Sequence, residues 1–425
     1  MKHLKRFETE AGYTQFKDTE NFVLPNVSYV EETNVVKFNP YVELGNPNVV
    51  CTYNITNISY KTQILYSDGL SCFSYMIVDG IEMDVDTHYQ FDTVGNHVVE
   101  FVLNDPTVIG DYAFCECSSL TSVTIPDSVT WIGSSAFYGC SSLPVIDNIR
   151  YADTCLVEVV DKSLTSYSIK EGTRIIGSFA FYSLSNLTNI TIPNGVITIG
   201  DQAFEWCSSL TSITIPDSVT RIGYSVFSGC ESLPVIDNIR YADTYLEEVV
   251  DKSLTSYSIK EGTRFIGESA FYECDNITEI TIPNSVIDIA SGAFSWCNNL
   301  TSVTIGNSVT NIGEGAFSGC RKLTSVTIPD SVTTIERKAF DGCYGLKSVT
   351  IGNSVTNIGK YAFQECSSLT SITCYASTTP SIQSNTFMSI LKGGTLYVPT
   401  ESDYSSWMSK DYYYLGYYNW TIQYI

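Results

Sequence analysis

The chain has 425 residues, with 46 Asp and Glu against 23 Lys and Arg, and a formal net charge of −23. This acidity argues against a nucleic-acid partner, because contacts to phosphates need Lys and Arg side chains. Hydrophobic residues make up 44% of the chain, which excludes a disordered protein. The sequence holds no apolar run of about 18 residues, so no membrane span is expected. The basic start MKHLKRFETEAGYTQF lacks the apolar stretch of a secretory signal, so no signal peptide is expected either.

Residues 1–43 carry no repeat, and we interpret them as an N-terminal attachment segment or cap. Leu4, Phe7, Ala11 and Phe16 have nearly helical spacing, which predicts a short helix. The alternation in the following VSYVEETNVVKF predicts one or two strands.

Residues 44–104 are predicted to form a small β-sandwich-like domain. Runs of β-branched and aromatic residues are separated there by Gly, Asn and Asp turn signals. A terminal hairpin is predicted between Tyr89–Phe91 and Val98–Val102. The segment weakly resembles the immunoglobulin-like modules of bacterial surface proteins.

A repeated stretch then dominates residues 105–388, and its best copy is SSLTSVTIPDSVTWIGSSAFYGC at 118–140. Most copies follow one another at 23 residues and two follow at 44. A fixed period in this range indicates a solenoid. The phenylalanine of each copy is found at Phe114, Phe137, Phe181, Phe204, Phe227, Phe271, Phe294, Phe317, Phe340 and Phe363.

Each copy predicts one coil. In the first full copy the alternation of SVTI predicts a strand with Val123 and Ile125 facing inward. Pro126 then starts a turn, a second short extended piece ends at Ile132, and a short helical turn follows Gly133. One coil buries too few side chains to offset the entropy of ordering its backbone, so stacking of coils must stabilise the fold.

Cysteines recur three residues after the repeat phenylalanine, at Cys117, Cys140, Cys207, Cys230, Cys274, Cys297, Cys320, Cys343 and Cys366. One cysteine per coil at a constant position is typical of a small buried hydrophobe. We therefore expect reduced, buried thiols. No zinc site is expected, because the single CxC at Cys115 and Cys117 has no second pair. No cofactor is expected either, because the sequence has no G-x-x-x-x-G-K and no G-x-G-x-x-G before a helix. His88 and His97 flank one predicted turn and are interpreted as surface residues, with a metal pair as the alternative.

The two long steps are interpreted as coils that carry an inserted hairpin. Residues 141–174 and 231–264 differ at only three positions, which indicates a recent duplication. A turn at Ala152–Thr154 predicts a hairpin that projects from the solenoid as a flap. Such a flap either marks a binding face or merely widens the sheet. After Phe363 the pattern decays, and residues 389–425 are predicted to form a C-terminal cap with a final strand, a short helix and an edge strand.

The pattern AFxxCxxLTSVTIPxSVTxIG resembles the BspA-type leucine-rich repeat family, over residues 108–387. The resemblance implies a β-rich repeat solenoid, a right-handed leucine-rich-repeat ramp, of the kind found in surface proteins of oral and gut bacteria and of some mucosal protozoa. Members are mostly described as adhesins or binding proteins. The opening residues and the terminal YVP segment also resemble repeat proteins of gut Bacteroidetes and of their bacteriophages.

No histidine lies in the solenoid, so no repeat can hold a catalytic Ser-His or Cys-His pair. We therefore expect a binding protein, with a carbohydrate-active enzyme as a distant alternative. Aromatic side chains of the turns and flaps and the outward hydroxyl row suit a glycan or protein ligand. The candidate ligand-binding residues are Tyr138, Tyr151, Trp206, Thr214, Tyr241, Tyr245, Tyr272, Trp296, Thr304 and Thr327.

Without a signal peptide, we expect an adhesin displayed on a phage virion, as a tail or head appendage docked to other virion proteins through residues 1–43. The alternative is a cell-surface adhesin of a gut Bacteroidetes-type organism. Either carrier would present the repeat sheet and the hairpins to a cell-surface glycan or protein.

Overall fold

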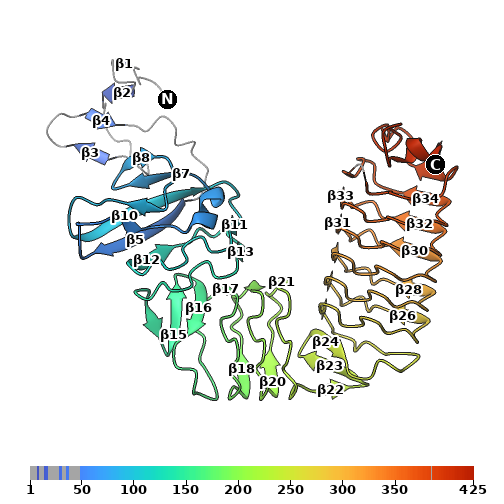
Figure 1. The fold of residues 1–425 in the computed structure, drawn as a ribbon, viewed down its shortest axis with the longest axis horizontal. Coiled ribbons are helices and arrows are strands. Elements are labelled where there is room, and N and C mark those ends of the chain that lie inside the picture. Colours follow the sequence, from blue (N-terminus) through green and yellow to red (C-terminus); the bar gives the residue numbers. More distant parts are fainter. Residues whose placement is uncertain (1–6, 9–13, 18–27, 31–34, 38–47, 384) are drawn as a thin grey trace. The chain divides into compact units, whose positions relative to one another are not determined.

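The computed structural model describes residues 7–8, 14–17, 28–30, 35–37, 48–383 and 385–425. The chain divides into two compact units, 1–158 and 159–425. Figure 1 shows that both units consist almost entirely of short strands and turns. No helix among these residues has the length and apolar character needed to cross a bilayer.

The first four strands form an antiparallel sheet of order β1-β2-β4-β3. The strands expected in VSYVEETNVVKF are confirmed, but the helix expected around Phe7 and Phe16 is wrong, because both residues lie in paired strands. Pairing with β4 overrides a helical period that only a few residues carry; Leu4 and Ala11 lie outside the described residues. The strands are β1 (Phe7–Glu8), β2 (Thr14–Lys17), β3 (Ser28–Val30) and β4 (Val35–Lys37).

A five-stranded sheet of order β12-β5-β10-β7-β8 follows. Its central strand β10 pairs with β5 and β7, so the hairpin expected from Tyr89 to Val102 is wrong: β9 pairs with β6 instead. The elements are β5 (Asn48–Ile55), β6 (Thr62–Gln63), the 3₁₀ helix η1 (Ser67–Cys72), β7 (Phe73–Val78), β8 (Ile81–Met83), β9 (His88–Tyr89) and β10 (Gly95–Leu103). The immunoglobulin-like resemblance and the domain boundaries at 43, 104 and 388 stay predictions.

The edge strand β12 (Leu120–Thr124) of this sheet is the first strand of the repeat and pairs antiparallel with β5. The aromatic core of the small β domain is also in contact with that of the first coils. The ring of Phe101 lies 5.4 Å from that of Phe114, and Phe114 stacks on Phe137 at 5.2 Å. The small β domain therefore covers the apolar N-terminal end of the solenoid, which would otherwise be open to water.

Each coil contributes a strand at one or both of two equivalent positions, and paired strands of coils 23 residues apart are parallel and in register. We call the strands at these two positions the first row and the second row. In the first row Val123 and Ile125 are buried, as expected. The first row contains β18 (Asn189–Thr191), β20 (Ser212–Thr214), β26 (Glu279–Thr281), β28 (Ser302–Thr304), β30 (Ser325–Ile328), β32 (Ser348–Ile351) and β34 (Ser371–Cys374). The second row contains β11 (Val108–Ile109), β13 (Trp131–Ile132), β17 (Ile175–Ile176), β19 (Thr198–Ile199), β21 (Arg221–Ile222), β25 (Phe265–Ile266), β27 (Asp288–Ile289), β29 (Asn311–Ile312), β31 (Thr334–Ile335) and β33 (Asn357–Ile358).

Stacked phenylalanines fill the core. From Phe271 to Phe387 the ring centroids of successive coils lie 4.8 to 5.8 Å apart, with planes within 15° of parallel. Seven of the nine repeat cysteines donate a hydrogen bond from the thiol to the phenylalanine carbonyl of the preceding coil, as from Cys320 to Phe294 at 3.2 Å. Cys117 donates to the Cys115 carbonyl instead. All fourteen cysteines are free, which agrees with the expected reduced thiols.

The residues around each phenylalanine form consecutive turns rather than the expected helical turn. Backbone hydrogen bonds there link residues three apart, as from the Tyr138 N–H to the Ser135 carbonyl. Ser135 has a φ of +55°, in the left-handed region, which stops a right-handed helix at its first turn.

The 44-residue steps are two coils of 22 residues each, not one coil with an insertion. The Val249 N–H donates to the Ala270 carbonyl at 3.0 Å, the same bond that Phe271 makes with Ala293 in the next coil. Val159 and Ala180 repeat this bond in the first copy. Valine therefore takes the place of the repeat phenylalanine, and the rings of Tyr245 and Tyr257 continue the aromatic core against Phe227 and Phe271.

The expected projecting flap is wrong as well. The hairpin of β23 (Ile239–Ala242) and β24 (Tyr245–Val249) turns at Asp243 and Thr244, but β24 also pairs in parallel with β25. It thus forms part of the second row of strands, as the alternative of a wider sheet proposes. Burying Tyr241, Tyr245 and Leu246 is favourable, whereas a free two-stranded flap would be marginal in water. Its short first strand is β22 (Val235–Ile236), and the first copy contains β14 (Val145–Ile146), β15 (Ile149–Ala152) and β16 (Cys155–Val159).

The C-terminal cap has the elements expected of it. Strand β35 (Thr395–Val398) extends the first row after β34, a 3₁₀ helix η2 (Leu415–Tyr418) follows, and β36 (Thr421–Tyr424) forms the edge. Trp407 is fully buried with its ring 5.5 Å from Phe387, so it ends the phenylalanine column.

Alkylation tests the cysteine column. At pH 8, iodoacetamide should label Cys72, the partly exposed cysteine, well before the repeat cysteines. Burial raises the pKa of Cys274 to about 11 and of Cys140 to about 12, so the reactive thiolate is scarce and shielded. Mass spectrometry of native and denatured protein measures this order, and fast labelling of several repeat cysteines in the native protein would contradict it.

Deletion of residues 228–249 tests the reassigned coil. It removes one whole 22-residue coil and brings Phe227 to the place of Val249, so the remaining coils keep their register. We expect one cooperative unfolding transition by circular dichroism, at a lower Tm. Deletion of residues 228–238, half a coil, serves as the control and should abolish cooperative unfolding. Equal damage from both deletions would refute the coil assignment.

Candidate functional site

Three of the candidate ligand-binding residues belong to the hairpins and are buried. Tyr151, Tyr241 and Tyr245 expose 2%, 2% and 3% of their surface. Their rings are packed in the core. The Tyr241 hydroxyl accepts a hydrogen bond from the Lys260 N–H at 3.1 Å. The expectation that these tyrosines contact a ligand is therefore corrected.

The aromatic candidates of the turns are accessible but fixed against their neighbours. Tyr138, Trp206 and Trp296 are 59%, 50% and 40% exposed, and Tyr272 is half-buried. Trp206 lies against Gly229 of the next coil, where a Cβ would come within 2.5 Å of the indole. Glycine at this position therefore lets the ring lie flat on the following turn, which covers one of its faces.

The hydroxyl candidates lie on the outer side of the first row of strands. Thr214, Thr304 and Thr327 are exposed on β20, β28 and β30. Thr327 continues in register into Thr350 and Thr373 of β32 and β34. Of the candidate residues, only Thr327 lies in the cavity that follows.

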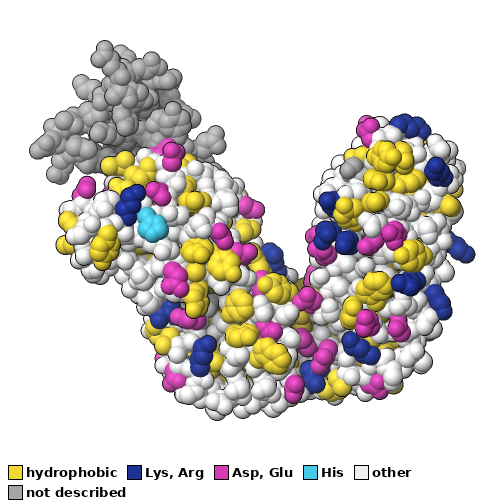
Figure 2. Space-filling model, viewed as in Figure 1, with side chains coloured by type: hydrophobic (Ala, Val, Ile, Leu, Met, Phe, Trp, Pro, Cys, Tyr) yellow, Lys and Arg dark blue, Asp and Glu magenta, His cyan; other side chains and the backbone are white. Residues whose placement is uncertain are grey.

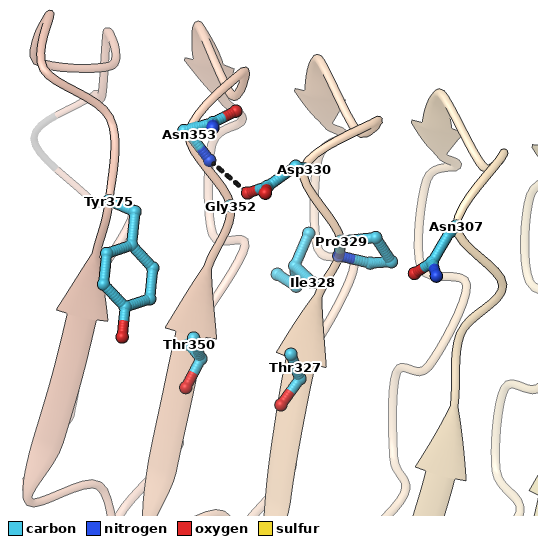
Figure 3. A pocket seen from close by; sticks show the side chains of 9 residues that line it. All are labelled: Asn307, Thr327, Ile328, Pro329, Asp330, Thr350, Gly352, Asn353 and Tyr375. Atoms are coloured by element: carbon cyan, nitrogen blue, oxygen red, sulfur yellow. Dashed lines mark hydrogen bonds between the residues drawn. The ribbon is translucent and has the colours of Figure 1, made fainter.

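A cavity of about 590 Å³ opens where β30 and β32 end. Figure 3 shows that its lining comes from the equivalent strands and turns of four successive coils, with Asn307 at one end and Tyr375 at the other. We call it the Tyr375 groove. It is lined by Asn307, Thr327, Ile328, Pro329, Asp330, Thr350, Gly352, Asn353 and Tyr375.

Differences between repeats create this groove. Most coils follow the first strand with Pro-Asp or Pro-Asn, but Gly306-Asn307 and Gly352-Asn353 replace the proline on both sides of Pro329. A Cβ at Gly352 would lie 2.5 Å from the Pro329 carbonyl oxygen, so only glycine allows this approach. The missing pyrrolidine rings leave space beside Pro329.

Hydrogen bonds between successive coils fix the turns at the edge of the groove. The Asn353 N–H donates to the Asp330 carboxylate at 2.9 Å, and the Asn307 N–H donates to the Asn284 side chain at 2.8 Å (Figure 3 draws the first). These bonds orient the side chains of the turns one coil apart. The turns at the edge of the groove are therefore held in one arrangement before a ligand binds.

Tyr375 forms the wall at the C-terminal end. Its N–H donates to the Ile351 carbonyl at 2.9 Å, which fixes the backbone, while half of its surface stays exposed. Tyr375 is not among the predicted residues, because it follows Phe363, where the repeat pattern decays and no repeat position predicts an aromatic residue. The groove thus combines one aromatic face with hydroxyl, amide and carboxylate groups.

These groups suit recognition of a polar, uncharged surface with apolar patches, as on a sugar ring. Among the described residues, no cluster of three or more His, Cys, Asp or Glu could hold a metal ion. His97, 2.7 Å from Asp79, belongs to the small β domain.

The pattern described as "BspA type Leucine rich repeat region" matches residues 89–155, 159–250, 244–311 and 288–404. No curated protein matches the chain significantly.

Solved structures of similar proteins come from several bacteria. A leucine-rich cell surface protein of Faecalibacterium prausnitzii A2-165 is 32% identical, over 63% of this chain and 76% of that chain, with a TM-score of 0.34. A leucine-rich repeat protein of Bacteroides ovatus ATCC 8483 is 27% identical, over 60% and 70%, with a TM-score of 0.28. The pneumococcal vaccine antigen PcpA is 20% identical, over 71% and 81%, with a TM-score of 0.33.

The matched repeats cover well over half of the sequence, and the protein is a member of the BspA-type leucine-rich repeat family.

Proposed function

We propose that the protein is a non-enzymatic surface-binding protein that holds a carbohydrate in the Tyr375 groove. The observation that carries the proposal is the exposed Tyr375 ring, which faces a groove lined by Thr327, Thr350, Asn307 and Asn353. Sugar rings present apolar C–H faces to aromatic rings and hydroxyls to amide and hydroxyl groups.

The form of the site favours a glycan over a folded protein. The groove runs across successive coils, about 4.8 Å apart, and so repeats its polar groups at close, regular intervals. An extended glycan repeats its hydroxyls in a similar way along its length. A protein interface usually needs a larger central cluster of apolar anchors, and this groove has one exposed aromatic ring.

Binding without catalysis is the activity that these residues support. Of the nine lining residues, Asp330 is the single carboxylate, and it already accepts a backbone hydrogen bond. Most glycosidases use two carboxyl groups that flank the scissile bond.

Display outside a cell agrees with family membership and with the relative from Faecalibacterium prausnitzii that is described as a cell surface protein. We place the protein on a bacterial cell surface. Display on a phage virion through residues 1–43 stays a prediction that rests on the resemblance of the opening residues; most of these residues lie outside those described.

Substitution of the aromatic wall tests this function. Tyr375→Ala should weaken binding to the glycans that the intact protein captures on a glycan array by about tenfold, which corresponds to ~1.4 kcal/mol. Tyr375→Phe should retain binding, because the ring face and not the hydroxyl makes the contact. Tyr138→Ala removes an equally exposed tyrosine from another unit and serves as the control. Unchanged binding by Tyr375→Ala would place recognition elsewhere.

A further inference from the structure

The C-terminal coils reverse the charge of the chain locally. Residues 321–360 contain six Lys and Arg and three Asp and Glu, within a chain of net charge −23. Figure 2 shows Lys and Arg side chains, in dark blue, over this part of the molecule. The basic residues are Arg321, Lys322, Arg337, Lys338, Lys347 and Lys360.

Arg321 is held between two aromatic rings. Its guanidinium carbon lies 5.3 Å from the ring centre of Trp296 and 5.8 Å from that of Tyr344. Trp296 in turn lies on Gly319, where a Cβ would come within 2.9 Å of the indole, and the Tyr344 hydroxyl donates to the Glu365 carboxylate at 2.9 Å. Both rings are therefore fixed, and they fix the plane of the guanidinium.

The donors of this guanidinium have no acceptor in the described part of the chain. Arg321 makes no hydrogen bond or ion pair there, and neither do the side chains of its exposed neighbours Lys322 and Lys347. By contrast, Arg337 pairs with Glu314, and Arg240 lies 3.0 Å from Glu248. We call Arg321, Lys322 and Lys347 the basic rim.

A planar, oriented guanidinium binds the two oxygens of a carboxylate or sulfate side by side, and lysines add charge without fixed direction. The indole of Trp296 contacts Gly319 and Arg321, which both belong to the next coil. These contacts leave less of the ring free to stack on a sugar than an isolated indole would offer. The cationic N–H groups of Arg321, Lys322 and Lys347 remain available to a ligand.

The basic rim and the Tyr375 groove lie at opposite ends of the same strands. Arg321 and Lys322 precede β30 and Lys347 directly precedes β32, whereas both strands end in the groove. A strand of four residues spans about 13 Å. The outward side chains of Ser325 and Ser348 lie between the two sites, and Thr327 and Thr350 already belong to the groove.

We propose that the ligand is an acidic polysaccharide, whose carboxylate or sulfate groups bind the basic rim while a sugar ring contacts Tyr375. The inference rests on the proposed glycan binding and names the class of glycan. A polysaccharide is favoured over an acidic peptide because the groove offers hydroxyl and amide groups in a regular row and the rim supplies only charge.

Binding of the full chain to four polymers tests the inference by biolayer interferometry. Polygalacturonate carries carboxylates, dextran sulfate carries sulfates, dextran is neutral, and polyglutamate is an acidic peptide. We expect binding to one of the acidic polysaccharides at least tenfold tighter than to dextran, weakened by added salt. Arg321→Ala should weaken it about tenfold and Arg321→Lys nearly as much, because the planar fork is lost.

Lys162→Ala removes an exposed charge many coils away and is the control, with no effect expected. Equal affinity of wild type and Arg321→Ala for the acidic polysaccharide would overturn the inference, and so would tighter binding to polyglutamate. If Tyr375→Ala weakens binding while Arg321→Ala and salt do not, the groove binds a neutral glycan and only the inference fails. If neither variant matters, the proposed function fails as well.

Discussion

The structure depends above all on one backbone hydrogen bond, which runs from the repeat phenylalanine of one coil to the alanine just before the phenylalanine of the next coil. Phe271 donates to Ala293, Phe294 to Ala316 and Phe317 to Ala339, each at 2.7 or 2.8 Å. This ladder keeps every coil on the same path, so the phenylalanines stack and the thiols reach the carbonyls beside them. Where valine replaces phenylalanine, at Val159 and Val249, the bond persists and tyrosines fill the core. Stability is thus shared between neighbouring coils, as in other solenoids.

The same ladder decides where a ligand can bind. In-register strands place the outward side chains in rows, so a regular repeat presents a uniform hydroxyl surface. Specific sites arise where one coil departs from the pattern. Glycine beside Pro329 opens the groove, the irregular coil after Phe363 supplies Tyr375, and Arg321 occupies a position where other coils have Ser, Glu, Asp, Asn or Tyr. All three departures fall in the C-terminal coils.

The regular features could be predicted from sequence, and the irregular ones could not. The inward Val123 and Ile125, the buried cysteines and the cap follow from positions that recur many times. The hairpins look like insertions when the copies are aligned on phenylalanine. They belong to coils of their own, because Val159 and Val249 make the backbone hydrogen bond that phenylalanine makes in the other coils. Tyr375 lies outside the pattern, and the contacts that Gly319 and Arg321 make with Trp296 come from the next coil.

Hydrogen–deuterium exchange of the full chain, with and without a saturating polysaccharide selected on the glycan array, tests the account most directly. We expect slower exchange in peptides that cover residues 321–330, 345–353 and 375, which contain the basic rim and the Tyr375 groove. We expect unchanged exchange in residues 48–104 and in the coils of Trp206. Protection of the small β domain, or of the N-terminal coils alone, would contradict it, because recognition would then lie outside the C-terminal coils.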